Sequence, residues 1–186
     1  MSAIKCISFF IIILLYQSSS AQDMFIDSGQ ELGNSNSWGI ALIDLDGDGD
    51  LDAYFDNTIW YNDGSGHFHA SQKSIGEGDP QFGDFNGDGF IDALVMHQIF
   101  INDKNWTFTA QQNLGSGILG SVLADFDDDA DIDVITLYMK TDSLWTNDGT
   151  GHFTNTGISF NGWAQSGYAV GDFDQDADTD IFVTIP

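Results

Sequence analysis

The sequence predicts an all-β protein built from repeats of about four short antiparallel strands. Three observations support this: short runs of β-branched and aromatic residues, Asn-Asp-Gly turn signals between such runs, and one Asp-rich loop that recurs along the chain. The 186 residues include two prolines and show no long stretch of helical periodicity. A period of about 40–45 residues with four strands per unit is typical of a propeller blade. We therefore expect a β-propeller-like fold of about three and a half to four blades.

Each Asp-rich loop is flanked by two runs that we expect to be strands. These runs are Gly39–Ile43 and Ala53–Phe55, Gln81–Phe82 and Ala93–Met96, Ser121–Ala124 and Val134–Tyr138, and Tyr168–Val170 and Ile181–Ile185. A hairpin motif containing Asn-Asp-Gly follows at Trp60–Phe68 and again at Trp145–Phe153, and Phe100–Phe108 is a degenerate third copy. The apolar–polar stretch after each hairpin supplies a fourth strand. Each unit thus contains two strands around the Asp loop and two around the hairpin.

The two ends of the chain resemble parts of one further unit. Met24–Ser28 resembles the last strand of a unit, and Ile181–Ile185 is the strand that follows the fourth loop. Pairing these ends would nearly close a ring, although the hairpin strand of the fourth unit is missing. Two interpretations stay open: a four-blade ring with a defective seam, and an incomplete or fragmentary propeller. We favour the second.

The first residues are typical of a secretory signal. Lys5 precedes the apolar run Ile7–Tyr16, and small residues follow up to Ala21. We expect a signal peptide at 1–21 and therefore a secreted or cell-surface protein. An apolar run of ten residues is too short for a transmembrane anchor. The lone cysteine, Cys6, lies in this segment, so the repeat domain at 22–186 is expected to have no disulfide. Its units are centred on loops 44–52, 84–92, 125–133 and 172–180.

The charge balance excludes several partners. The chain has 29 acidic residues against four basic ones and a formal net charge of −25. Nucleic acid and anionic membranes are poor partners for such a surface. With 42% hydrophobic and 13% aromatic residues, the chain has enough apolar material to fold, unlike most acidic disordered segments.

The four Asp-rich loops share one frame of nine positions, and their starts are 40, 41 and 47 residues apart. Positions 1, 3, 5 and 9 carry side-chain oxygens: Asp44, Asp46, Asp48 and Asp52; Asp84, Asn86, Asp88 and Asp92; Asp125, Asp127, Asp129 and Asp133; Asp172, Asp174, Asp176 and Asp180. Position 7 varies in chemistry, as expected if its backbone carbonyl is the ligand: Asp50, Phe90, Asp131 and Asp178.

These loops predict calcium sites. Two carboxylates about 4 Å apart repel each other by roughly 4 kcal/mol at an effective dielectric constant near 20, so their convergence calls for a cation. Calcium accepts six to eight hard oxygen ligands in flexible geometry, and the absence of His and Cys from the loops argues against zinc and softer metals. We expect up to four calcium ions.

The third and fourth loops depart from the pattern. Gly47, Gly49, Gly87 and Gly89 permit a sharp backbone path in the first two loops. Ala130 and Ala177 replace the glycine at position 6, and Asp128 and Gln175 replace the glycine at position 4. A residue with a Cβ in a left-handed conformation costs about 1 kcal/mol. We therefore expect these two sites to be weaker or slightly reshaped.

An EF-hand is the main alternative, because the first nine positions match its loop. It requires a bidentate Glu at position 12 and flanking helices. Position 12 holds no acid in any of the four loops: Phe55, Val95, Thr136 and Val183. The EF-hand interpretation is therefore rejected.

Taken together, the Asp loop and the Asn-Asp-Gly-x-Gly-x-Phe motif resemble FG-GAP and VCBS repeats, as found in integrin-type β-propellers and secreted bacterial surface proteins. The resemblance covers about 24–186. It implies that the loop joins the two inner strands of a blade and is stapled by calcium. It also implies a role in cell adhesion, carbohydrate binding or scaffolding.

No catalytic motif is present, so we expect a protein that is not an enzyme. Trp60, Phe100 and Trp145 are repeat-equivalent and predicted to lie in the blade core, whereas Trp38 and Trp163 lie in variable connections. His67 and His152 are likewise repeat-equivalent and expected to be structural. Two functions remain open: a calcium-dependent module that binds an extracellular glycan or protein, and a purely structural part that assembles with further propeller repeats.

Overall fold

The computed structural model describes residues 27–32, 40–104, 106–139, 141–160 and 168–183. The chain divides into two compact units, 1–34 and 35–186. In the first unit, the backbone amide of Gly29 donates to the carboxylate of Asp27 at 2.8 Å. Asp27 and Ser28 are not part of a strand, and the rest of the expected strand Met24–Ser28 lies outside the described residues, as does the expected signal peptide at 1–21.

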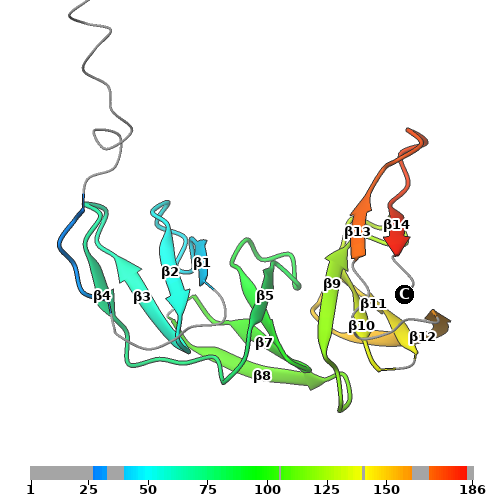
Figure 1. The fold of residues 1–186 in the computed structure, drawn as a ribbon, viewed down its shortest axis with the longest axis horizontal. Coiled ribbons are helices and arrows are strands. Elements are labelled where there is room, and N and C mark those ends of the chain that lie inside the picture. Colours follow the sequence, from blue (N-terminus) through cyan, green and yellow to red (C-terminus); the bar gives the residue numbers. More distant parts are fainter. Residues whose placement is uncertain (1–26, 33–39, 105, 140, 161–167, 184–186) are drawn as a thin grey trace, which may run out of the picture. The chain divides into compact units, whose positions relative to one another are not determined.

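The second unit forms three four-stranded antiparallel sheets and one two-stranded sheet in its described ranges (Figure 1). Strand order within each sheet follows chain order, so each sheet is a meander. The sheets are β1 (Ile40–Ile43), β2 (Asp52–Phe55), β3 (Thr58–Asn62) and β4 (Phe68–Ala70); β5 (Pro80–Gly83), β6 (Asp92–Val95), β7 (Gln98–Asn102) and β8 (Phe108–Asn113); β9 (Gly120–Ala124), β10 (Asp133–Leu137), β11 (Asp142–Asn147) and β12 (Phe153–Phe160); and β13 (Tyr168–Gly171) with β14 (Asp180–Val183).

This arrangement confirms the all-β prediction and the assignment of four strands to each complete unit. The expected strands around the loops agree with the observed ones to within one or two residues, and Gly39, Thr184 and Ile185 of these expected strands lie outside the described residues. The main difference is that the Asp at position 9 is the first residue of β2, β6, β10 and β14 rather than part of the loop. Position 12 lies on these same strands, which agrees with the rejection of an EF-hand.

The hydrophobic core lies between consecutive sheets. One buried cluster joins the first and second sheets: Leu45, Tyr54, Ile59, Ile75, Ala93 and Val95. A second cluster joins the second and third sheets: Phe85, Leu94, Ile99, Leu114, Ile118, Val134 and Phe153. A single meander cannot bury its apolar face by itself, so each repeat is stabilised by its neighbour.

The repeat-equivalent aromatic residues contribute to this packing. Phe100 packs against the first cluster and Trp145 against the second. Trp60 stacks on Phe55 with ring centroids 5.4 Å apart. The blade-core prediction is therefore confirmed for Phe100 and Trp145, while Trp38 and Trp163 lie outside the described residues.

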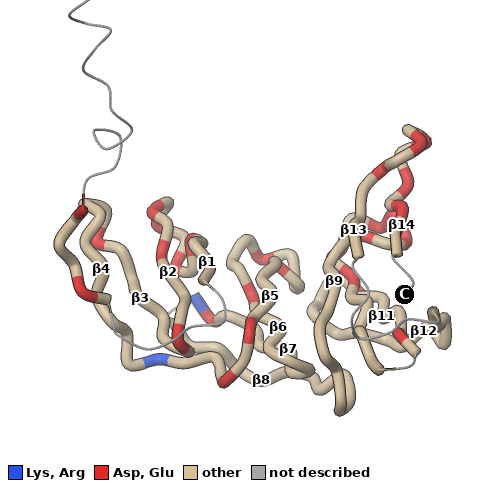
Figure 2. Tube along the Cα trace, viewed as in Figure 1, with Lys and Arg blue, Asp and Glu red and all other residues tan. Residues whose placement is uncertain are grey.

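Acidic residues gather at the turns and loops, and most of each strand is free of charge (Figure 2). The hairpin turns share one backbone hydrogen bond, from Asp63 N to the carbonyl of His67 (3.1 Å) and from Asp148 N to that of His152 (3.2 Å). Both histidines thus take part in the turn through their main chain. Within the described ranges, we find no helix with the length and apolar character needed to cross a bilayer.

Candidate metal centres

Each Asp-rich loop connects two strands that pair directly on either side of it. The ladder places position 9 opposite the last residue of the preceding strand, as in the pairs Ile43–Asp52 and Gly83–Asp92. The same pairing recurs at Ala124–Asp133 and Gly171–Asp180. The sheet therefore closes each loop at its base and presents the intervening carboxylates at the same end of every sheet.

The loop backbone has the same left-handed residues in all four copies. Positions 4 and 6 have φ values of 78° and 93° in the first loop and 69° and 85° in the second, where both are glycine. In the third loop, Asp128 and Ala130 have φ values of 62° and 74°. In the fourth, Gln175 and Ala177 have 67° and 78°. The backbone of the last two loops is therefore not reshaped at positions 4 and 6, contrary to our expectation. Weaker metal binding by these two loops stays a prediction.

The carboxylate at position 1 holds this conformation in place. Its Oδ2 accepts the backbone amide of position 6 in every loop, from Gly49 to Asp44 at 3.0 Å and from Ala130 to Asp125 at 2.9 Å. The corresponding distances are 2.8 Å in the second loop and 3.2 Å in the fourth. These hydrogen bonds do not depend on a glycine, which explains why alanine is accommodated in the later loops.

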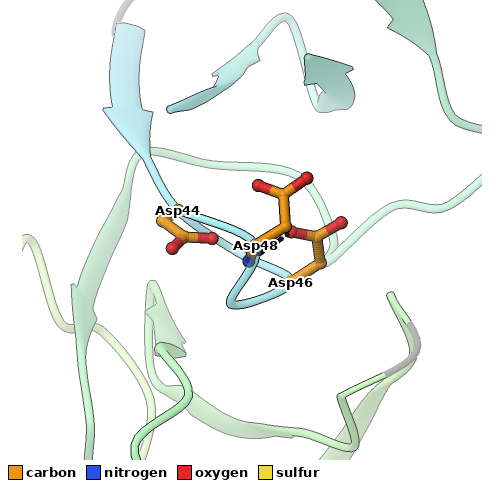
Figure 3. Close-up of side chains that lie close together, drawn as sticks. All are labelled: Asp44, Asp46 and Asp48. Carbon is orange, nitrogen blue, oxygen red and sulfur yellow. Dashed lines mark hydrogen bonds between the residues drawn. The ribbon is translucent and has the colours of Figure 1, made fainter. Parts of the chain in front are cut away.

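Positions 3 and 5 direct their oxygens along the loop in the same way. Asp46 accepts the amide of Asp48 at 3.1 Å, and Asp48 accepts the amide of Asp50 at 2.9 Å. Figure 3 shows Asp44, Asp46 and Asp48 around the first loop, with the hydrogen bond between the last two drawn dashed. Short side chains that fold back onto the backbone bring several oxygens toward one region.

Three of the four loops bring three carboxylates together, with one ligand atom from each lying within 4.8 Å of the others. The groups are Asp44, Asp46 and Asp48; Asp125, Asp127 and Asp133; and Asp172, Asp174 and Asp180. The second loop, all of whose residues the structure describes, has no such acidic triad. Its position 3 is Asn86, which would supply an amide oxygen instead.

The side chains at position 7 lie against neighbouring turns. A Cβ built on Gly64 would meet the carboxylate of Asp50 at 2.6 Å, and one built on Gly149 would meet that of Asp131 at the same distance. Phe90 lies under the ammonium group of Lys104, 4.4 Å from the ring centroid. The side chain at position 7 thus has contacts other than metal, as expected if only its backbone carbonyl is a ligand. The contacts with Asp50 and Asp131 also explain why the hairpin motif has glycine at these places, since a Cβ there would clash.

Position 9 has a second role that sequence reasoning missed. In the second loop, the Oδ2 of Asp92 accepts the amide of Phe85 at 2.9 Å, and its Oδ1 accepts the amide of Asn102 at 2.8 Å. Asp52 and Asp133 make the same pair of hydrogen bonds, and all three carboxylates are buried. The sequence signal for this second role was the asparagine of the hairpin motif, because it recurs in step with the Asp-rich loop.

Burial and mutual repulsion raise the pKa of several of these carboxyls. Loss of solvation is the largest cause for Asp92, whose pKa rises to about 6, and the charges of Asp84 and Asp88 add to it. Desolvation likewise raises the pKa of Asp46, Asp52, Asp127, Asp131 and Asp133. For Asp178, repulsion from Asp128 of the third loop is the largest cause. The loops therefore concentrate negative charge where it is costly without a cation.

The donor set fits calcium. All side-chain candidates are oxygen atoms of Asp or Asn, which suit a hard cation. The Oδ1 atom of Asp125 is buried and has no hydrogen-bond partner in the structure, which is the condition of an oxygen aimed at an ion. Occupancy of the individual loops by calcium stays a prediction.

The sheets and loops together define a repeat protein with propeller-like blades and Asp-rich loops. Residues 125–183, which include the third and fourth loops, match the family model of an FG-GAP-like repeat. A solved structure with a similar fold is that of an Agrocybe aegerita lectin, described as specifically recognising non-reducing terminal N-acetylglucosamine. The TM-score is 0.57 and the identity 20%, over 76% of this chain and 45% of the lectin chain. The chain thus spans less than half of that lectin. No curated protein matches the sequence significantly.

Proposed function

We propose that this chain is an extracellular binding module whose blades are stapled by calcium and whose ligand is a carbohydrate. The observation that carries the calcium part is the recurrence of a carboxylate triad in three of the four Asp-rich loops, with the buried and unpartnered oxygen of Asp125 among them. The FG-GAP-like repeat at 125–183 supports the same assignment. Export through the segment at 1–21 and a role in binding rather than catalysis belong to this proposal.

A carbohydrate ligand is supported by the fold shared with a lectin and by one hollow of the third sheet. This hollow has a volume of about 520 Å³ and is lined by Gly117, Tyr138, Met139, Thr141 and Ser143. An aromatic ring and apolar atoms can pack against the face of a sugar, while hydroxyl groups hydrogen-bond to its edge. The proposed site thus lies at the turn between β10 and β11.

A glycan array probed with purified protein tests this proposal, in about 1 mM calcium and in excess chelator. We expect binding to a limited set of glycans in calcium and loss of binding in chelator. Calorimetry should show two to four calcium sites under the same conditions. Binding to no glycan in either condition would refute the proposed carbohydrate ligand. Absence of calcium binding would refute the proposed calcium sites.

Variants locate the sugar site. Tyr138→Phe combined with Thr141→Val removes two hydroxyls from the hollow and should weaken glycan binding about thirtyfold, since each hydrogen bond to a ligand is worth about 1 kcal/mol. Tyr61→Phe is the matched control, because it removes a hydroxyl from an exposed tyrosine on β3. Equal effects of the two changes would contradict a site at this hollow.

A structural role in a larger assembly is the second candidate. In the described part of the chain, β13 and β14 form a two-stranded sheet, and Phe173 and Phe182 are 56% and 61% exposed. Large exposed apolar side chains favour contact with a further protein surface. A monodisperse monomer that unfolds cooperatively, measured by light scattering and calorimetry, would count against this candidate.

A further inference from the structure

Two of the asparagines that open the hairpin turns lie between two metal loops. Asn102 and Asn147 are the last residues of β7 and β11, and their side chains are 1% and 4% exposed. Each side-chain amide nitrogen donates to two backbone carbonyls. One carbonyl belongs to the Asp loop of the same sheet and the other to the Asp loop of the preceding sheet.

The first bridge joins loops one and two. The Nδ2 atom of Asn102 donates to the carbonyl of Leu45 at 2.7 Å and to that of Ile91 at 3.1 Å. Leu45 is position 2 of the first loop, and its amide donates to Asp52 at 2.9 Å. The backbone amide of Asn102 donates to Asp92 at 2.8 Å. One buried side chain therefore connects the position-9 carboxylates of neighbouring loops through a continuous set of hydrogen bonds.

The second bridge repeats this arrangement between loops two and three. Asn147 donates through Nδ2 to the carbonyl of Phe85 at 2.8 Å and to that of Ile132 at 3.2 Å. The amide of Phe85 donates to Asp92 at 2.9 Å, and the amide of Asn147 donates to Asp133 at 2.8 Å. Asp92 thus takes part in both bridges.

Asn62 is the repeat-equivalent residue with a different set of partners. The structure gives its Nδ2 atom one acceptor among the described residues, the carbonyl of Leu51 in its own loop at 3.2 Å. Its Oδ1 accepts the turn amides of Gly64 and Gly66, so it stabilises the hairpin. Among the described residues, this matched asparagine therefore makes no bridge to a second loop.

These bonds couple the loops because they are buried. A shift of position 2 in one loop would leave its carbonyl or the asparagine amide without a partner, and an unsatisfied buried polar group is unfavourable. We propose that Asn102 and Asn147 are positioning residues that make calcium binding at neighbouring loops cooperative. This inference rests on the proposed binding of calcium by the loops, and adds that an ordered loop favours the ordered state of the next.

The first experiment leaves both asparagines intact. Asp84→Asn with Asp88→Asn disables the second loop while keeping Asp92, whose carboxylate belongs to the bridges. Calcium is titrated into the full-length protein, and the backbone amide signals of Gly49 and Ala130 report on loops one and three by NMR. We expect calcium to bind loops one and three at least about fivefold more weakly than in the unaltered protein, which is a typical coupling between sites.

The second experiment removes one bridge. In an Asn147→Leu background, disabling the second loop should change the calcium affinity of the third loop less than about twofold, whereas its effect on the first loop persists through Asn102. Asn62→Leu is the control and should leave both couplings intact. A purely electrostatic coupling between loops would survive the Asn147→Leu change, so this outcome would overturn the role of the asparagine.

The outcomes separate the two levels of the proposal. Absence of calcium binding at every loop would refute the proposed function together with the inference. Calcium binding with unaltered affinities after the second loop is disabled would refute the inference alone. If Asn147→Leu does not fold, the first experiment can still refute the inference, because it alters neither asparagine.

Discussion

The first two metal loops and the last two reach the same backbone conformation with different residues. Gly49 and Gly89 have left-handed φ values of 93° and 85° at position 6, and Ala130 and Ala177 adopt 74° and 78° there. The hydrogen bond from position 6 to the position-1 carboxylate is present in all four loops. Strand pairing and carboxylate capping therefore impose the conformation, and glycine only reduces its cost.

The loops differ more in what surrounds them. The residue at position 2 is fully buried between sheets in the first two loops, where Leu45 is 0% and Phe85 1% exposed. In the fourth loop the same position is Phe173, which is 56% exposed. The stability of a loop thus depends on the neighbouring sheet as well as on its own sequence.

The largest expected difference concerns position 9. Asp92→Ala leaves the buried amides of Phe85 and Asn102 without their acceptor, and we expect a loss of about 3 kcal/mol in the free energy of unfolding. Asp180→Ala removes one hydrogen bond, to the amide of the exposed Phe173, and should cost about 1 kcal/mol. Urea denaturation in the presence of chelator measures both values without a contribution from calcium.

Equal losses for the two substitutions would show that the position-9 hydrogen bonds are worth the same in buried and exposed loops. Burial by the neighbouring sheet would then make no difference to the stability that these hydrogen bonds contribute.

The next effect is a pH dependence that calcium reverses. Asp92 has a pKa of about 6 in the folded protein and an ordinary value of 3.8, so the folded state binds more protons between these pH values. Without calcium, the free energy of unfolding should therefore rise as pH falls from 7 toward 4, by at most about 3 kcal/mol. With calcium the slope should reverse, because protons compete with the ion for the same carboxylates.

Thermal unfolding at several pH values, in chelator and in calcium, measures this dependence. An Asp92→Asn variant is the control, since it lacks the titrating group and should have a smaller slope in chelator. A calcium-free protein that loses stability between pH 7 and pH 5 would contradict the predicted sign.

The smallest effect concerns position 6. Ala130→Gly and Ala177→Gly relieve a left-handed alanine and should each stabilise the protein by about 1 kcal/mol. Gly49→Ala and Gly89→Ala should each destabilise it by about the same amount. A Cβ on either glycine meets no heavy atom within 4 Å, so backbone conformation alone accounts for the change. Denaturant titration of the four variants checks the opposite signs, and a loss of stability in the two glycine variants would contradict them.

Much of this architecture could be predicted from the sequence. The strands around the loops were found to within one or two residues because the alternation of apolar runs and turn residues is a local signal. The oxygen atoms that converge in the triads were predicted because the same positions recur as Asp or Asn in four copies. The left-handed positions were also recognisable from the glycines of the first two loops.

The hydrogen bonds that join one repeat to the next could not be predicted in the same way. Asp92 accepts amides from Phe85 and Asn102, which lie 7 and 10 residues away, and Asn102 reaches Leu45, which is 57 residues away. No short pattern encodes a contact between one repeat and the next. The burial of position 2 could not be predicted either. This position is phenylalanine in both the second and the fourth loop, but it is buried in the second and exposed in the fourth.

By itself, the sequence determined the repeat, the strands and the oxygen donors, because each depends on residues that are close along the chain. Only the tertiary structure decided which carboxylates are buried, which loops are joined by asparagine and which aromatic side chains remain exposed. These properties depend on packing between sheets, where the solvation of a charge and the partner of a hydrogen bond are set by residues from another repeat.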